Sequence, residues 1–172
     1  RHRRIGCSTF NDGILVQSNV FQKYLPVGRL SIAVEFLNRW GIDEIMIVDI
    51  SATPEGRGPN MDLLRASIKN NFTPLSIGGG ITTLDQMKLL NHWSAEKVVL
   101  NTAAVENPAI IKQAAEIFGN QFVVVSLDVR KIDGEKCEIV THGGKKGTGQ
   151  DPIAFAKKAA EAGAGEIVIT SI

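Results

Sequence analysis

The chain alternates short apolar runs with longer segments in which apolar residues recur at helical spacing. Short apolar runs bounded by Gly or polar residues predict buried strands, whereas a spacing of three to four residues predicts helices. Strands are predicted over residues 3–9, 44–50, 75–77, 97–100, 121–128 and 166–172. Helices are predicted over 30–40, 61–70, 84–92, 107–119 and 151–163. This alternation predicts an α/β protein with a parallel sheet and right-handed crossovers.

Two turn signals interrupt the alternation. Asn11-Asp12-Gly13 predicts that the chain doubles back after the first strand, and Asp133-Gly134 predicts a hairpin after the fifth. Lys145 and Lys146 lie among glycines, which predicts a mobile basic loop, although a solvated loop with two incidental lysines fits equally well.

Polar or small residues follow every predicted strand. They are Thr9, Asp49, Gly78 to Gly80, Asn101, Asp128 and Ser171. A doubly wound sheet and a barrel both fit the alternation, but a barrel gathers all its strand ends into one mouth. The pattern therefore favours a (β/α)8 TIM-barrel type of fold.

An internal repeat supports the barrel. Gly41-Ile-Asp-Glu-Ile-Met-Ile47 resembles Gly163-Ala-Gly-Glu-Ile-Val-Ile169, which makes the second and sixth strands copies in a half-barrel duplication, so that the fifth strand repeats the first. An eight-unit barrel needs roughly two more strand-helix units than this sequence contains. We therefore expect residues 1–172 to form a single phosphate-binding barrel domain that is incomplete at its C-terminus, and either a fragment or part of a longer chain.

Pro74-Leu-Ser-Ile-Gly-Gly-Gly-Ile-Thr82 predicts a strand that ends in a phosphate-binding turn, because Gly78, Gly79 and Gly80 leave their backbone amides accessible to a bulky anion. Asn101 and Thr102 follow the next strand and supply further hydrogen-bond donors. The alternative is that the glycines close a tight turn and bind nothing. Neither motif has the spacing of a Walker loop or a dinucleotide fingerprint.

Composition and charge exclude several classes of function. The net charge of +1 provides no basic field for nucleic acid, so any anion affinity must be local. Cys7 and Cys137 are far apart, which argues against a disulfide framework or a zinc site and favours a reducing compartment, the cytoplasm. No apolar run reaches membrane-spanning length, and no pattern indicates a cofactor or a metal.

Several motifs together resemble one family, the cyclase subunit of imidazole glycerol phosphate synthase. They lie at residues 45–57, 78–81, 97–108, 123–128, 141–144 and 163–172, and the resemblance covers essentially the whole chain. The related isomerase of histidine biosynthesis shares the glycine turn and the repeat. However, Asn101-Thr-Ala-Ala-Val105 and Ser51-Ala-Thr-Pro-Glu-Gly-Arg57 favour the cyclase.

The resemblance implies a glutaminase partner that docks on the face opposite the active site, and ammonia that passes through the barrel to a ribulosyl phosphate intermediate. It implies that two carboxylates close the imidazole ring and that Asp128 is one of them. Asp49 and Ser171, which follow their own strands, are expected at the same mouth. The resemblance further implies that one substrate phosphate is held by Gly79, Gly80, Asn101 and Thr102. The family's charged ring at the ammonia entrance corresponds to Arg3, Glu44, Lys97 and Glu166. The alternative for this ring is an ion-pair cluster that merely closes the barrel floor.

Two positions depart from the family. Thr9 stands where the family has its other catalytic aspartate, and Gln17 replaces a lysine. A hydroxyl cannot replace a carboxylate as general base near neutral pH. The sequence therefore favours a paralogue of surface-polysaccharide gene sets, which supplies glutaminase-derived ammonia to a separate amidotransferase that builds acetamidino sugars. The alternative is an active cyclase of histidine biosynthesis; a third is a folded fragment without activity.

Overall fold

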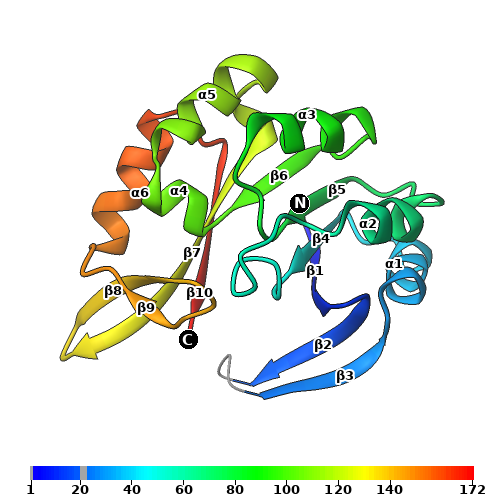
Figure 1. Cartoon of the computed structure of the whole chain (residues 1–172), viewed down its shortest axis with the longest axis horizontal. Coiled ribbons are helices and arrows are strands. Elements are labelled where there is room, and N and C mark those ends of the chain that lie inside the picture. Colours follow the sequence, from blue (N-terminus) through cyan, green and yellow to red (C-terminus); the bar gives the residue numbers. More distant parts are fainter. Residues whose placement is uncertain (1, 20–22) are drawn as a thin grey trace.

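Six parallel strands form a barrel that is not closed (Figure 1). The computed structural model describes residues 2–19 and 23–172. In spatial order the strands are β1 (Ile5–Asn11), β4 (Glu44–Asp49), β5 (Leu75–Gly78), β6 (Lys97–Leu100), β7 (Val123–Asp133) and β10 (Glu166–Ser171). Within the described residues, no pairing joins β10 to β1. The predicted fold class, a (β/α) barrel represented through its sixth strand, is confirmed.

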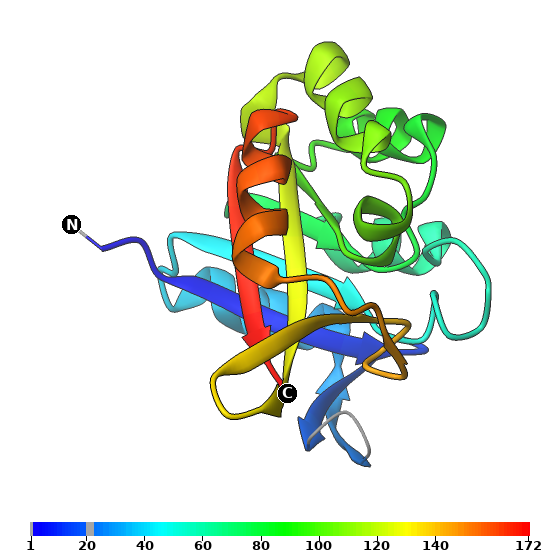
Figure 2. The same ribbon diagram turned by 90° about the vertical axis from the view of Figure 1, so that its left-hand side faces the viewer.

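The helices cover the outer surface of these strands (Figures 1 and 2). They are α1 (Leu30–Arg39), α2 (Met61–Ile68), α3 (Leu84–His92), α4 (Thr102–Glu106), α5 (Ala109–Phe118) and α6 (Pro152–Glu161), with a 3-10 turn η1 at Asn120–Phe122. Thr83 caps α3 in a capping box with Gln86. The five-residue α4 was not predicted. In the part of the chain that the structure describes, no helix is long and apolar enough to cross a membrane.

Successive side chains of each barrel strand point alternately outward to the helices and inward to the barrel interior, which produces two apolar layers. Ile45, Ile47 and Ile77 are fully buried in the main core, which also contains Leu64 and Met87 of the covering helices. The intervening positions point into the barrel, where a second, smaller cluster forms. Its members are Met46, Val99 and Val124, with Val48 and Val168 packed against them. An apolar layer thus lies across the barrel interior.

Two antiparallel hairpins extend from the barrel. β1 turns at Asp12-Gly13 into β2 (Ile14–Asn19), and β7 turns at Gly134 into β8 (Lys136–Thr141), so both predicted hairpins are confirmed. The third strand of each extension was not predicted: β3 (Lys23–Arg29) pairs with β2, and β9 (Lys146–Gly147) pairs with β8. In the segment predicted as a mobile basic loop, Lys145 therefore lies in a turn and Lys146 begins a paired strand opposite Thr141.

These extensions also reveal the repeat in three dimensions. The order β1-β2-β3-α1-β4 recurs as β7-β8-β9-α6-β10. Each unit consists of a barrel strand, a two-strand excursion, a helix and the next barrel strand, with both barrel strands parallel. The element order therefore supports the half-barrel duplication that the sequence repeat predicts.

Candidate functional site

A cavity of about 450 Å³ lies at the C-terminal ends of the strands. The predicted mouth residues that line it are Thr9, Asp49, Gly79, Gly80, Asn101, Thr102 and Asp128. Ser171 does not line the cavity; its neighbour Thr170 does. The reason is the strand period of two, which places Glu166, Val168 and Thr170 on one face of β10 and Ser171 on the other.

Asp128 is the acid-base candidate, and its carboxylate is held by an amide. Asn101 Nδ2 donates to Asp128 Oδ2 at 2.9 Å, which fixes the carboxylate at the cavity wall. Burial raises the pKa of Asp128 above its ordinary value, and the hydrogen bond from Asn101 offsets part of that rise. A carboxyl group with a raised pKa accepts and returns protons nearer neutral pH than an ordinary aspartate does.

Thr9 faces the same cavity, but its hydroxyl group is already used in the fold. Thr9 Oγ1 donates to the backbone oxygen of Val16 at 2.9 Å, across the pairing of β1 with β2. The side chain therefore fastens the first hairpin to the barrel strand. This bond gives Thr9 a structural role. The residue therefore supplies no second carboxylate to act together with Asp128.

The glycine turn is required by close packing. Gly79 and Gly80 have φ values of 99° and 68°, which L side chains rarely adopt. A Cβ at Gly79 would overlap the backbone of Asp49, and one at Gly80 would lie 2.6 Å from the Cβ of Ala52. Packing alone accounts for both glycines, so the tight-turn interpretation is sufficient for their presence and leaves phosphate binding as a prediction.

Asp49 lines the cavity, yet its fully buried carboxylate is committed to the loop that follows β4. Arg57 Nη1 lies 2.9 Å from Asp49 Oδ2, and the Ser51 hydroxyl donates to Asp49 Oδ1 at 2.8 Å. The hydrogen bond with Asp49 raises the pKa of Arg57, and a second bond with Glu55 adds to the effect. Asp49 therefore holds loop 51–58 over the glycine turn. The motif Ser51 to Arg57 signals this loop in the sequence, although the pairing itself was not predicted.

Two further residues of the cavity wall had no role assigned from the sequence. Glu106 ends α4, and His142 follows β8 with a φ of 55°. The backbone nitrogen of His142 donates to Thr102 Oγ1 at 3.2 Å, so the second hairpin touches the predicted anion site. Thr141-His142-Gly143-Gly144 was one of the motifs shared with the family, and it was the available signal for this contact.

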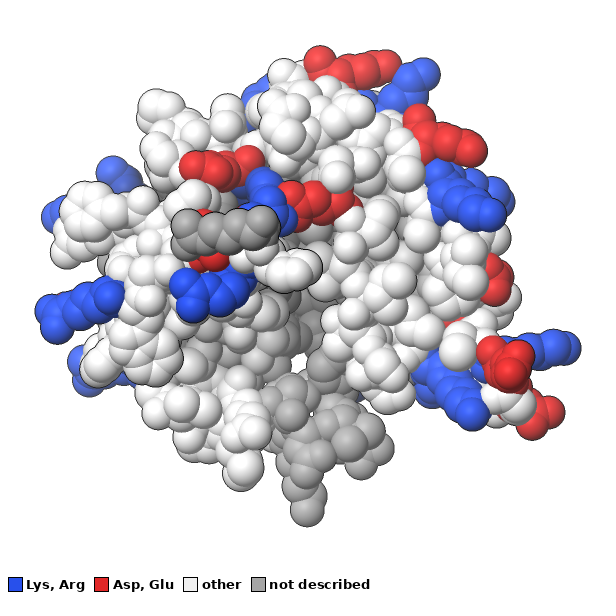
Figure 3. Space-filling model, turned by 180° about the vertical axis from the view of Figure 1, so that it is seen from behind, with Lys and Arg blue, Asp and Glu red and all other residues white. Residues whose placement is uncertain are grey.

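At the opposite end of the barrel, the four charged residues predicted there form one paired cluster. Lys97 Nζ lies 2.8 Å from Glu44 Oε2 and 2.7 Å from Glu166 Oε1, and Arg3 Nη2 lies 2.7 Å from Glu166 Oε2. Ser76 also donates to Glu44. Burial alone would raise the pKa of Glu166, but hydrogen bonds from Arg3 and Lys97 outweigh burial and hold that pKa below its usual range. Figure 3 shows acidic and basic side chains gathered on the face seen from behind.

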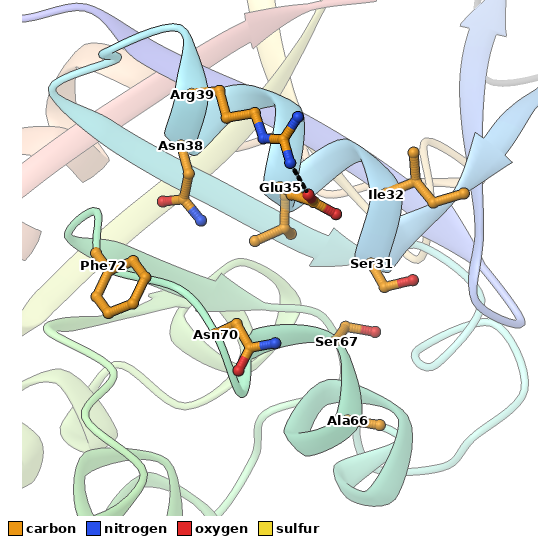
Figure 4. A pocket seen from close by; sticks show the side chains of 10 residues that line it. Ser31, Ile32, Glu35, Asn38, Arg39, Ala66, Ser67, Asn70 and Phe72 are labelled. Atoms are coloured by element: carbon orange, nitrogen blue, oxygen red, sulfur yellow. Dashed lines mark hydrogen bonds and ion pairs between the residues drawn. The ribbon is translucent and has the colours of Figure 1, made fainter.

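A second hollow, of about 510 Å³, lies outside the barrel between α1 and α2 (Figure 4). Three of its polar side chains have partners: Arg39 Nη2 lies 2.6 Å from Glu35 Oε1, and Asn38 Oδ1 accepts from the backbone nitrogen of Thr73. Phe72 stands at its edge with 93% of its surface exposed. None of the predicted site residues lines this hollow, so the cavity at the strand ends is the candidate site.

Comparison with known proteins agrees with this architecture. "Putative imidazole glycerol phosphate synthase subunit hisF2" of Vibrio vulnificus (strain YJ016) is 38% identical over 170 residues, which is 99% of this chain and 62% of the relative. "Imidazole glycerol phosphate synthase subunit HisF" of Endomicrobium trichonymphae is 40% identical over 170 residues, or 99% of this chain and 65% of the relative. The chain thus spans less than two thirds of the length of either. The model of the family described as "Histidine biosynthesis protein" matches residues 5–172, and the chain therefore belongs to that family.

Proposed function

We propose that this chain is the barrel subunit of an imidazole glycerol phosphate synthase-like system, binding a phosphorylated ligand at its strand ends and receiving ammonia from a glutaminase partner. The family match and the printed names of the two relatives support the system. The cavity supports the ligand site, because Gly79, Gly80, Asn101 and Thr102 all line it at the ends of the adjacent strands β5 and β6. No cofactor has a role in this proposal.

The separation of the two ends of the barrel supports the route for ammonia. Arg3, Glu44, Lys97 and Glu166 are paired at one end, whereas Asp128 lies at the other. The apolar layer around Met46, Val99 and Val124 lies between them, and neutral ammonia crosses such a layer at lower cost than an ammonium ion. We assign the paired cluster as the entrance gate for ammonia. The alternative is that the cluster only closes the floor of the barrel, in which case substitutions in it should affect stability alone.

One observation favours a paralogue over an ordinary cyclase: the Thr9 hydroxyl is bonded to the Val16 carbonyl oxygen. Of the three carboxylates in the described cavity wall, Asp49 and Glu106 are ion-paired, and Asp128 is bonded to an amide. A site with one available carboxylate lacks the second group that ring closure uses. We therefore propose that the chain passes ammonia to a separate acceptor amidotransferase in surface-sugar biosynthesis, such as that of lipopolysaccharide.

The alternative function, active cyclisation in histidine biosynthesis, is favoured by Asp128 itself. Its raised pKa suits an acid-base group, and the bond from Asn101 orients it toward the cavity. The same residues would serve a lyase that closes an imidazole ring. The two functions share the ligand site and differ in whether one carboxylate is sufficient.

Exposed aromatic side chains at the gate end support a docked partner. Trp40 and Phe72 are 70% and 93% exposed and lie just before β4 and β5, at the end of the barrel that carries the charged cluster. Aromatic residues are enriched in protein interfaces and often dominate their binding energy. We place this system in the cytoplasm, a location supported by the free thiols of Cys7 and Cys137.

Association with a glutaminase tests the partner. The probe is the glutaminase subunit of an imidazole glycerol phosphate synthase, with sedimentation and glutamine hydrolysis as measurements. We expect complex formation and faster hydrolysis, and a weaker complex with Phe72→Asp. The matched control is Lys145→Glu, an exposed charge change near β9, which should leave association unchanged. Absence of association at micromolar concentrations, or equal weakening by both variants, would contradict docking at the gate end.

A further inference from the structure

The short helix α4 and the segment after β8 meet through a cluster of polar and charged side chains at the cavity rim. Thr102 and Glu106 are four residues apart, which places them on one face of the helix. The backbone nitrogen of His142 donates to Thr102, while His142 Nε2 lies 3.9 Å and Lys146 Nζ 3.0 Å from Glu106 Oε1. A lysine and a histidine therefore converge on one carboxylate oxygen, one helical turn from Thr102.

The charge of the cavity wall makes this cluster relevant to anion binding. Among the described residues that line the cavity, the carboxylates and the basic side chains are Asp49, Arg57, Glu106, Asp128 and His142. The guanidinium of Arg57 is committed to Asp49, Ser51 and Glu55. A phosphorylated ligand would therefore meet an excess of acids. Just beyond that wall, Lys146 is a cation already paired with Glu106, since Lys146 Nζ lies 3.0 Å from Glu106 Oε1.

We propose that Glu106 occupies the place of a phosphate group, and that a phosphate bound beside Thr102 displaces Glu106 and takes over Lys146 and His142. This inference rests on the phosphate site of the proposed function. In this arrangement Lys146 and His142 are ligand-binding residues. Glu106 is a specificity residue, since an incoming anion must compete with its carboxylate.

The exchange is favourable for a dianion because the existing ion pair is weak. The side chains of Lys146 and Glu106 are 61% and 46% exposed, and ion pairs as exposed as this contribute little net stability. A phosphate carries close to two charges and three strong acceptor oxygens, whereas the carboxylate carries one charge. The long lysine side chain can follow the phosphate without movement of β9, because lysine binds phosphate as a flexible point charge.

Titration with inorganic phosphate at low ionic strength, followed by calorimetry, tests the exchange. We expect Lys146→Met to weaken phosphate binding about two- to fivefold, the effect of one exposed charge pair, and Glu106→Gln to strengthen binding by a similar factor. The control is Lys145→Met, which removes a neighbouring exposed lysine and should leave the dissociation constant unchanged. Thermal unfolding of each variant checks that the fold is retained.

The outcomes separate this inference from the function on which it rests. If the unmodified chain binds phosphate but the Lys146 and Glu106 variants bind with its affinity, the exchange is wrong and the phosphate site remains. Weaker binding by Glu106→Gln would also overturn the exchange, because it would show that Glu106 supports the anion. If the unmodified chain binds no phosphate, the ligand site of the proposed function fails, and the exchange fails with it.

Discussion

At the scale of single residues, the cavity combines an aspartate with a raised pKa and a threonine whose hydroxyl group makes a structural hydrogen bond. Asp128 lies in a partly buried position beside Asn101, whereas the Thr9 hydroxyl donates a hydrogen bond to the Val16 carbonyl oxygen. The residue types were readable from the sequence. The hydrogen bond of Thr9 was not, because it depends on the register of β1 against β2.

The raised pKa of Asp128 predicts a pH-dependent cost to stability. The folded state keeps the proton at pH values where the unfolded chain, with an aspartate pKa of about 3.9, has lost it. The stability that protonated Asp128 contributes is therefore fully present below the unfolded pKa. It is lost as pH rises through the folded pKa, and the ionised, desolvated carboxylate then costs stability. We expect Asp128→Asn to be more stable than the unmodified chain at neutral pH, with the difference shrinking under acid.

Urea unfolding over a series of pH values measures this difference. The control is Asp85→Asn, which changes a carboxylate that is 92% exposed and should show no such trend. A difference between Asp128→Asn and the unmodified chain that stays constant from acid to neutral pH would show that Asp128 is not desolvated in the folded state.

At the scale of the elements, the loop after β4 and the turn after β5 support each other. Asp49 and Arg57 hold loop 51–58; that loop packs against Gly80, and the Asp49 backbone packs against Gly79. The two polar strand ends that the sequence marks as site residues are therefore also a packing unit. Because packing alone requires these glycines, the glycine turn by itself is weak evidence for phosphate binding.

Replacing Gly79 by alanine should test the packing unit. We expect Gly79→Ala to lower the free energy of unfolding by about 2–5 kcal/mol, through the positive φ and the overlap with the Asp49 backbone. The matched control is Gly134→Ala, where φ is 53° and nothing lies within 4 Å of the added Cβ. It should cost only the conformational part, about 1–2 kcal/mol. Equal costs at the two positions would refute the close packing.

The elements also show what sequence patterns can and cannot predict. Where apolar residues recur at helical spacing over a long segment, the predicted helix bounds agree with the structure to within a few residues. The bounds of α3 coincide with the predicted range of 84–92. Strand β3 was missed because Lys23–Arg29 contains Pro26 and lacks strict alternation. Helix α4 is too short to show a period. Ser171 was placed at the mouth because sequence position alone does not tell which face of β10 it occupies.

At the scale of the whole molecule, the paired cluster joins strands that are distant in the sequence. Lys97 of β6 bridges Glu44 of β4 and Glu166 of β10, and Arg3 reaches Glu166 from the segment before β1. The resemblance to the family pointed to these four residues, and Glu44, Lys97 and Glu166 each begin a strand of the barrel. Pairing was necessary, since buried charges persist only when they are compensated.

Removing the central lysine should destabilise the barrel as a whole. Lys97 is 11% exposed and Glu44 is 3% exposed at the side chain, so we expect Lys97→Ala to cost about 3–5 kcal/mol in the free energy of unfolding. Arg3→Ala is the control, because its side chain is 46% exposed and an exposed pair contributes at most about 1 kcal/mol. Denaturant unfolding measures both. A cost for Lys97→Ala no larger than that for Arg3→Ala would show that water already compensates Glu44.

The central claim, a ligand-binding barrel that has lost half of its acid-base pair, is tested most directly by ring closure itself. The measurement is the rate of imidazole product formation from the ribulosyl phosphate intermediate and ammonium, with the unmodified chain and with Thr9→Asp. One acid-base group contributes about 10²–10⁴-fold, so we predict turnover lower by that factor than in a cyclase with both carboxylates. We also predict a partial recovery with Thr9→Asp, limited by Gln17. Rapid product formation with Thr9 in place would contradict the account and establish the chain as an ordinary cyclase.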